Sequence, residues 1–295
     1  MPLALRHPTI NYVWKGPLRY RETGKRIAPA LVVCALLLLF EGCARSSRSE
    51  TTNIILAGST SVQPFAELLA EDFAHRYPDG PVINVQGGGS TAGIEAALTH
   101  TADIGMSSRN LKEDEQNAGL TPKPIAYDAI AIVVNLGNPV SALTSEQVRA
   151  IFSGQITNWR QVGGEDRPIV IVTREEGSGT RGAFEEMLMK GERISDLALR
   201  QDSNGAVRVI VSSDRAAIGY ISLGIVGNVV KPVALDGISP SVEAVLAGQY
   251  PLVRPFLFVL NGQPSPPVQR FIDFVLSADA QAILAKEGLI PVEQS

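Results

Sequence analysis

From Asn53 onward, short apolar runs alternate with amphipathic segments, a pattern typical of strands alternating with helices. Mostly apolar runs predict strands at 54–57, 82–85, 103–107, 129–134, 169–173 and 252–260. Segments with apolar residues at helical spacing predict helices at 62–77, 92–98, 145–152, 181–190 and 268–284. The run 129–134 is apolar at every position, which favours a strand buried on both faces. This alternation favours an α/β fold with parallel strands joined by crossover helices.

The first 42 residues differ from the rest of the chain. Six Lys or Arg side chains precede an apolar run of 14 residues, Ile27–Phe40, and Gly42 and Cys43 follow shortly after it. A basic segment, a short apolar segment and a small residue before a cleavage point are the parts of a secretory signal. The apolar run is shorter than the roughly 20 residues of a membrane span. We therefore predict a signal peptide at 1–42 and a polar tether at 43–52.

Cys43 follows Gly42 directly, which resembles the bacterial lipobox, where the cysteine is acylated and becomes the new N-terminus. Phe40 and Glu41 depart from the small or aliphatic residues that are usual there. We predict lipidation at Cys43. Ordinary cleavage without a lipid and an uncleaved anchor are the alternatives.

Composition narrows the class of protein. The only cysteines are Cys34 and Cys43, so the exported part has none to pair in an oxidising compartment and depends on its core. Its length suits two lobes better than one. Removing six basic and two acidic side chains with residues 1–42 leaves 20 basic and 28 acidic ones, a net charge of −8. This acidic balance argues against nucleic acid binding.

Four short clusters of serine, threonine and glycine stand out: GSTS at 58–61, GGGST at 87–91, SSR at 107–109 and REEGSGT at 174–180. Three of them lie between a predicted strand and a predicted helix, where free backbone N–H groups can bind an anion. Each cluster alone is an ordinary set of capping residues, and the expected caps are Thr60, Ser61, Ser90, Thr91, Ser178, Gly179 and Thr180. Together, and with the guanidinium of Arg174, they favour a site for an oxyanion.

Catalysis has little support in this pattern. The chain has no P-loop, and neither Ser90 nor Ser178 lies in G-x-S-x-G. The exported part has only His75 and His100 as possible bases, both away from the clusters, and no acidic residues have metal-ligand spacing. We predict a protein that is not an enzyme, with no catalytic residues, cofactor or metal.

The order GSTS…GGGSTAG…ADIGMSSR…YDAIAIVVN…LTSEQVRAIFSGQITNW…REEGSGTRGAFE…AIGYISLG resembles the phosphate-binding component of bacterial ABC phosphate importers, the PstS-like family. The resemblance covers essentially all of 53–293 and is most specific at 143–159 and 174–181. It implies a type II periplasmic-binding-protein fold. Such a fold has two α/β lobes of mixed sheets flanked by helices, a two-strand hinge and a ligand cleft between the lobes.

The turn at 135–139 is the predicted lobe boundary. Lobe 1 then comprises 53–134 and 234–295, and lobe 2 comprises 135–233. The resemblance also implies inorganic phosphate as ligand and ABC permease subunits in the membrane as partners. It implies a monomer in the periplasm or on the outer face of the cell membrane, held by a lipid anchor. Carried over by motif, the phosphate-binding residues are Thr60, Ser61, Ser90, Ser108, Arg174, Ser178, Gly179 and Thr180.

Ser108 departs from the family pattern. Well-known members have an aspartate there, which accepts a phosphate proton and repels fully ionised sulfate. A serine hydroxyl can donate or accept, and Asp128 is an alternative acceptor. Other functions that remain open are binding of sulfate or molybdate, a sensor or adhesion lipoprotein with the same fold and, last, a phosphatase.

Overall fold

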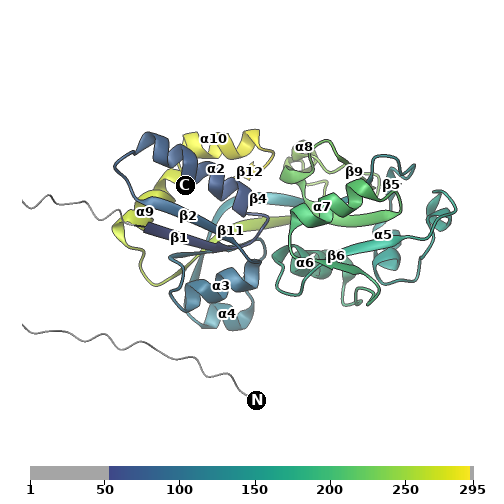
Figure 1. The fold of residues 1–295 in the computed structure, drawn as a ribbon, viewed down its shortest axis with the longest axis horizontal. Helices are drawn as coiled ribbons and strands as arrows, with labels where there is room; N and C mark the ends of the chain where they lie inside the picture. The colour runs from purple at the N-terminus through teal and green to yellow at the C-terminus, as the bar shows by residue number, and fades with distance from the viewer. Residues whose placement is uncertain (1–52, 293–295) are drawn as a thin grey trace, which may run out of the picture. The chain divides into compact units, whose positions relative to one another are not determined.

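The computed structural model describes residues 53–292. The predicted signal peptide at 1–42, the tether at 43–52 and the lipidation at Cys43 lie outside the described residues. Strands and helices alternate along the described part of the chain (Figure 1). Between residues 53 and 292, no helix combines the length and the apolar character needed to cross a bilayer.

The strands are β1 Asn53–Gly58, β2 Val82–Gly87, β3 Ile104–Ser107, β4 Leu120–Asn135, β5 Ala142–Leu143, β6 Val170–Arg174, β7 Leu199–Gln201, β8 Ala217–Ser222, β9 Val230–Pro232, β10 Ala234–Leu235, β11 Val253–Asn261 and β12 Ile290–Pro291. The helices are α2 Gln63–Arg76, α3 Ser90–Leu98, α4 Glu113–Asn117, α5 Ser145–Phe152, α6 Gly179–Phe184, α7 Asn204–Ser213, α8 Val242–Leu246, α9 Pro266–Val275 and α10 Ala278–Lys286. A π-helix, Glu185–Met189, continues α6.

One mixed sheet runs through the described residues in the order β2-β1-β3-β11-β4-β8-β6-β7. Residues 120–129 of β4 pair antiparallel with β11, and residues 130–134 pair antiparallel with β8. We call β2, β1, β3, β11 and residues 120–129 the first half-sheet. The rest of β4 with β8, β6 and β7 is the second half-sheet. Figure 1 shows β4 extending from one group of helices to the other.

Each half-sheet has its own apolar core. In the first, helices α2 and α9 pack aromatic side chains together, and Phe73 is fully buried with its ring 5.4 Å from that of Phe271. In the second, Trp159 and Phe152 are buried, and the rings of Phe184 and Tyr220 stack at 4.0 Å. The prediction that 129–134 is buried on both faces is confirmed, since all six residues are 0% exposed.

The chain passes between the half-sheets at two adjacent points. One is β4, and the other is the step from Leu252 into β11. The two lie side by side, because the backbone N–H of Ile130 donates to the carbonyl of Leu252 at 2.8 Å. Leu235 and Leu252 belong to the same core as Trp159. The segment before β11 therefore packs with the second half-sheet.

Two local predictions are wrong. The single helix predicted at 268–284 is two helices, because α9 ends at Val275 and the hydroxyl of Ser277 caps α10 by accepting from the N–H of Ala280 at 3.4 Å. The cap of α5 is Thr144 and not Ser145: the Thr144 hydroxyl accepts from the N–H of Gln147, whose side chain bonds back in a capping box.

We expect Phe73→Ala to lower the free energy of unfolding by about 3–5 kcal/mol, because it leaves a cavity among the aromatic rings of the first core. Urea unfolding measures the change. Leu246→Ala is the control, since Leu246 is 67% exposed. Equal losses for both variants would contradict the packing described.

Candidate functional site

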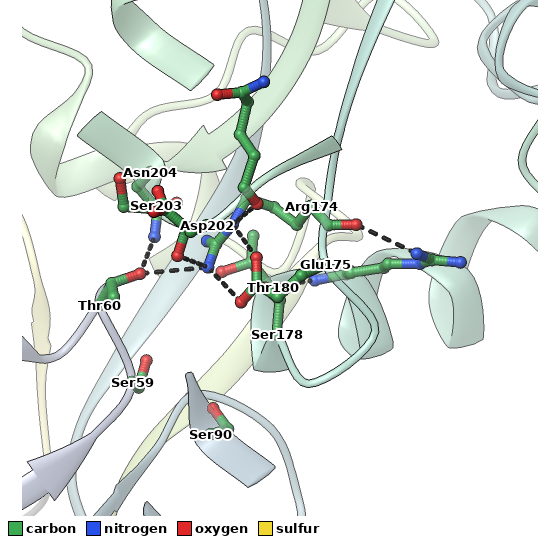
Figure 2. Close-up of polar contacts among 12 residues, drawn as sticks. Ser59, Thr60, Ser90, Arg174, Glu175, Ser178, Thr180, Asp202, Ser203 and Asn204 are labelled. Carbon is green, nitrogen blue, oxygen red and sulfur yellow. Dashed lines mark hydrogen bonds and ion pairs between the residues drawn. The ribbon is translucent and has the colours of Figure 1, made fainter. Parts of the chain in front are cut away.

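The four clusters meet where parallel strands of both half-sheets end. Figure 2 shows residues of the clusters at 58–61, 87–91 and 174–180. Residues 59–61 follow β1, 88–91 follow β2, and 108 follows β3 in the first half-sheet. Residues 174–180 begin at the last residue of β6 in the second. Ligands of α/β sheets bind at such strand ends.

A serine cluster, formed by Ser59, Ser90 and Ser108, lies on the side of the first half-sheet. The Ser59 hydroxyl donates to Ser108 Oγ at 2.9 Å, and the Ser108 backbone N–H donates to Ser90 Oγ at 3.0 Å. All three residues are buried. Sequence reasoning placed Ser90 and Ser108 here but left Ser59 out of the site.

The predicted helix caps need correction. Helix α2 has no side-chain cap from Thr60 or Ser61, because Ser59 Oγ accepts from the N–H groups of Ser61 and Val62 at 3.2 and 3.4 Å. Ser90 is the first residue of α3 rather than its cap, and Gly89 holds that position with φ of 90°. The hydroxyls of Ser61 and Ser90 are thereby left for contacts within the site.

Side chains from the two half-sheets touch through Ser61. Its Oγ lies 2.8 Å from Thr180 Oγ1 and accepts from Asn204 Nδ2 at 2.7 Å. Thr60 Oγ1 accepts from Arg174 Nη2 at 3.2 Å, and Figure 2 shows Thr60 facing Arg174 and Asn204. The predicted residues Thr60, Ser61, Arg174 and Thr180 are therefore brought together.

Arg174 is 1% exposed and is held on several sides. Its Nε and Nη2 donate to the two carboxylate oxygens of Glu175 at 3.0 and 2.8 Å, and Nη2 also donates to the carbonyl of Asp202 at 3.0 Å. Its Nη1 is buried and has no hydrogen-bond partner in the described part of the chain. A buried donor without an acceptor costs about 1–3 kcal/mol, and more for a charged group. An anion oxygen at Nη1 would remove that cost.

Ser178 and Gly179 have different tasks. The Ser178 hydroxyl caps α6, as predicted, by accepting from the N–H of Arg181 at 3.2 Å, whereas Gly179 and Thr180 are the first residues of the helix and not its caps. The backbone of Gly179 lies against the serine cluster: a Cβ there would fall 2.1 Å from Ser90 Oγ and 2.7 Å from Ser108 Oγ. Only glycine lets the two half-sheets approach so closely at this point.

Sequence reasoning missed a second arginine in the site, Arg254 on β11. It faces Asp128 on β4, and its Nε and Nη2 donate to Asp128 Oδ2 at 3.1 and 2.9 Å. Oδ1 of Asp128 accepts from the Ser222 hydroxyl at 2.8 Å. Asp128 is therefore not a free acceptor for a ligand, as the alternative above supposed. Asp128 directly precedes the apolar run 129–134, and Arg254 is the only charged residue in the predicted strand 252–260. Two charged side chains beside such apolar runs were the signal that could have indicated a buried pair.

Burial sets the electrostatics of this pair. It raises the pKa of Asp128 above its ordinary value, against the opposing effects of Arg254 and Ser222. It lowers the pKa of Arg254, against the attraction of Asp128. The ordinary pKa values of the two groups lie so far apart that the pair stays ionised at neutral pH. Both arginines of the site thus have a carboxylate partner.

Arg109 follows the serine cluster in sequence but turns away from it. Its Nη1 and Nη2 donate to both oxygens of Glu115 at 2.7 Å. Burial alone would raise the pKa of Glu115, but hydrogen bonds from Arg109 and from the Lys112 backbone hold that pKa below its ordinary value.

This lowered pKa predicts a pH dependence. The stability that Glu115 contributes is present above its ordinary pKa of 4.5 and is lost as the pH falls through the lower value in the folded state. We expect wild type to exceed Glu115→Gln in unfolding free energy at neutral pH, and the gap to close in acid. Denaturant titrations of both proteins from neutral to acidic pH measure it. A gap that is constant with pH would exclude this ion pair as its source.

Together these groups are suited to holding a tetrahedral oxyanion. Hydroxyls, the unpartnered Nη1 of Arg174 and the first backbone N–H groups of α6 are all donors. The fold already holds these donors in place without a ligand, so binding loses little conformational entropy in ordering them.

Known proteins resemble this chain in sequence and in fold. A family model described as a PBP superfamily domain matches residues 44–279. The phosphate-binding protein PstS of Pseudomonas aeruginosa is 33% identical, over 81% of this chain and 83% of its own length. PstS of Bacillus subtilis is 28% identical, over 89% of this chain and 92% of its own length.

A solved structure from Clostridium perfringens is 43% identical and has a TM-score of 0.80, covering 82% of this chain and 100% of its own. It is described as a candidate phosphate ABC transporter substrate-binding protein with bound phosphate.

Proposed function

Because this chain belongs to the PBP superfamily, we propose that it binds inorganic phosphate as the extracytoplasmic substrate-binding component of an ABC importer. The fold is the mixed α/β fold of type II periplasmic binding proteins. Relatives named as phosphate-binding proteins, and a related structure with bound phosphate, support this ligand.

One observation of this chain carries the proposal. Nη1 of Arg174 is a buried, charged donor without a partner among residues 53–292, on a guanidinium whose Nη2 donates to the hydroxyl of Thr60 across the two half-sheets. We assign the predicted residues Thr60, Ser61, Ser90, Ser108, Arg174, Ser178, Gly179 and Thr180 to the phosphate site. We add Ser59 and Asn204, because their side chains bond directly to members of that set.

The two half-sheets would be the two lobes, and their meeting point would be the cleft. The packing of the two cores supports the predicted division into lobe 1 (53–134 and 234–295) and lobe 2 (135–233), except for the segment that begins at residue 234. Leu235 and Leu252 pack in the core of the second half-sheet. We therefore assign 234–252 to lobe 2. The hinge would consist of β4 and the start of β11, where the chain crosses twice.

Binding and release without a reaction fit the site best. The charged side chains Arg174, Glu175, Asp128 and Arg254 are all engaged in ion pairs, which leaves none of them free as a base. The protein would be a monomer outside the cytoplasm, anchored through a lipid on Cys43 and working with membrane permease subunits. Mass spectrometry of the membrane-extracted protein tests the anchor.

Calorimetry on residues 44–295 tests the ligand directly. We expect phosphate to bind and a tenfold excess of sulfate or molybdate not to displace it. Displacement by sulfate would favour a general oxyanion-binding protein. Binding of none of the three would overturn the transport proposal and favour a sensor or adhesion protein.

A further inference from the structure

Arg254 contacts residues on both sides of the candidate site. It lies opposite Asp128 in the strand register and is 2% exposed. After the two bonds to Asp128, its remaining hydrogens reach two hydroxyls and, at 3.4 Å from Nη1, the backbone carbonyl of Ser108. Nη2 donates to Ser61 Oγ at 3.1 Å and Nη1 donates to Thr180 Oγ1 at 2.8 Å. Ser61 belongs to the first half-sheet and Thr180 to the second.

These bonds determine which way the Ser61 hydroxyl points. A hydroxyl oxygen accepts at most two hydrogen bonds. Ser61 Oγ already accepts from Arg254 Nη2 and from Asn204 Nδ2. Its contact with Thr180 at 2.8 Å must therefore be a donated one.

The same count then applies to Thr180. Its Oγ1 accepts from Ser61 and from Arg254 Nη1, so both acceptor positions are filled. Its own hydrogen has no acceptor among residues 53–292. Within the site, this hydrogen joins Nη1 of Arg174 as a second buried donor that has no acceptor in the described residues.

We propose that Arg254 is a positioning residue that, together with the hydroxyl of Ser61, makes Thr180 an obligate hydrogen-bond donor toward an unprotonated oxygen of a phosphate dianion. This inference rests on the proposed phosphate site and concerns which protonation state that site selects. The hydroxyls of the serine cluster are not bonded to Arg254. Ser59 Oγ already accepts from two backbone N–H groups, so Ser90 and Ser108 are left to receive the protonated oxygen. Affinity should therefore rise with pH through the second ionisation of phosphate.

A double-mutant cycle tests whether Arg254 acts through the hydroxyls. The variant Asp128→Leu/Arg254→Met removes both charges together, which avoids leaving a buried carboxylate unpaired. Calorimetry with inorganic phosphate first compares the affinity of this variant with that of wild type. A second comparison sets the same variant carrying Thr180→Val against Thr180→Val alone. We expect the pair replacement to weaken binding about tenfold or more when Thr180 is present, and by less than about twofold when it is absent.

Equal losses in the two backgrounds would overturn the inference, because Arg254 would then act by its charge alone. The variant Arg254→Lys keeps the positive charge and changes only the hydrogen-bond geometry. Lysine has three donors without the planar fork and cannot satisfy Asp128 twice and both hydroxyls, so we expect weakening comparable to that of the pair replacement. Wild-type affinity for this variant would contradict the inference even if the pair replacement failed to fold.

The control and the pH profile separate this role from a structural one. Replacing the other buried pair by Arg109→Met/Glu115→Leu should leave phosphate affinity within about twofold. The rise of affinity with pH should flatten in the Asp128→Leu/Arg254→Met variant, because the freed hydroxyls can then accept. An unchanged slope would overturn the inference. If wild type binds no phosphate, the proposed function itself fails.

Discussion

Replacing Arg174 by methionine should weaken phosphate binding by about a hundredfold or more. The change removes Nη1, the buried donor that has no protein partner, and the bond from Nη2 to Thr60. A charge-assisted hydrogen bond contributes about 1.5–3 kcal/mol, and each 1.4 kcal/mol is a factor of ten in Kd. Calorimetric titration with phosphate measures the loss.

The matched control for this change is Arg149→Met. Arg149 is half-buried on α5, and its Nε donates to the carbonyl of Leu188 at 3.0 Å, away from the clusters. We expect this variant to bind phosphate as wild type does. A loss of similar size in both variants would mean that Arg174 supports the fold and does not touch the ligand.

The second large effect is expected from Gly179→Ala. Its methyl group would fall 2.1 Å from Ser90 Oγ, far inside contact distance, so the two half-sheets could not meet as they do. We expect phosphate binding to weaken by at least about tenfold, since binding requires both sides of the site to close on the ligand. Calorimetry measures binding, and thermal unfolding without ligand shows whether the fold is intact.

Gly205→Ala is the control for the methyl group itself. A Cβ at Gly205 would meet only Ser203 Oγ, at 4.0 Å. Wild-type affinity is expected for this variant. If Gly179→Ala also bound as wild type does, the close approach of Gly179 to the serine cluster would not be needed for binding.

The alternation of strands and helices could be read from the sequence because apolar runs and helical spacing are local signals. The strand at 129–134 is an example, since complete burial requires every side chain to be apolar. The division between α9 and α10 was missed because apolar residues continue at helical spacing across Leu276 and Ser277. Nothing in that spacing marks the point where one helix ends and the next begins.

The site was predicted where its residues follow strands and carry a recognisable cluster, as Arg174 and Ser178 do. Arg254 was missed because its partners are distant in sequence: 126 residues separate it from Asp128 and 193 from Ser61. Only the sheet order, with β11 beside β4, brings them together. Asn204 was missed for a similar reason, since it begins α7 in a stretch without predicted elements.

A crystal structure of residues 44–295 grown with phosphate tests the central claim most directly. The account predicts one phosphate between the half-sheets, with oxygens within hydrogen-bond distance of Arg174 Nη1 and Thr180 Oγ1 and with the serine cluster on the opposite side. Phosphate bound elsewhere, or a cleft in which Arg174 Nη1 makes no contact with it, would contradict the account.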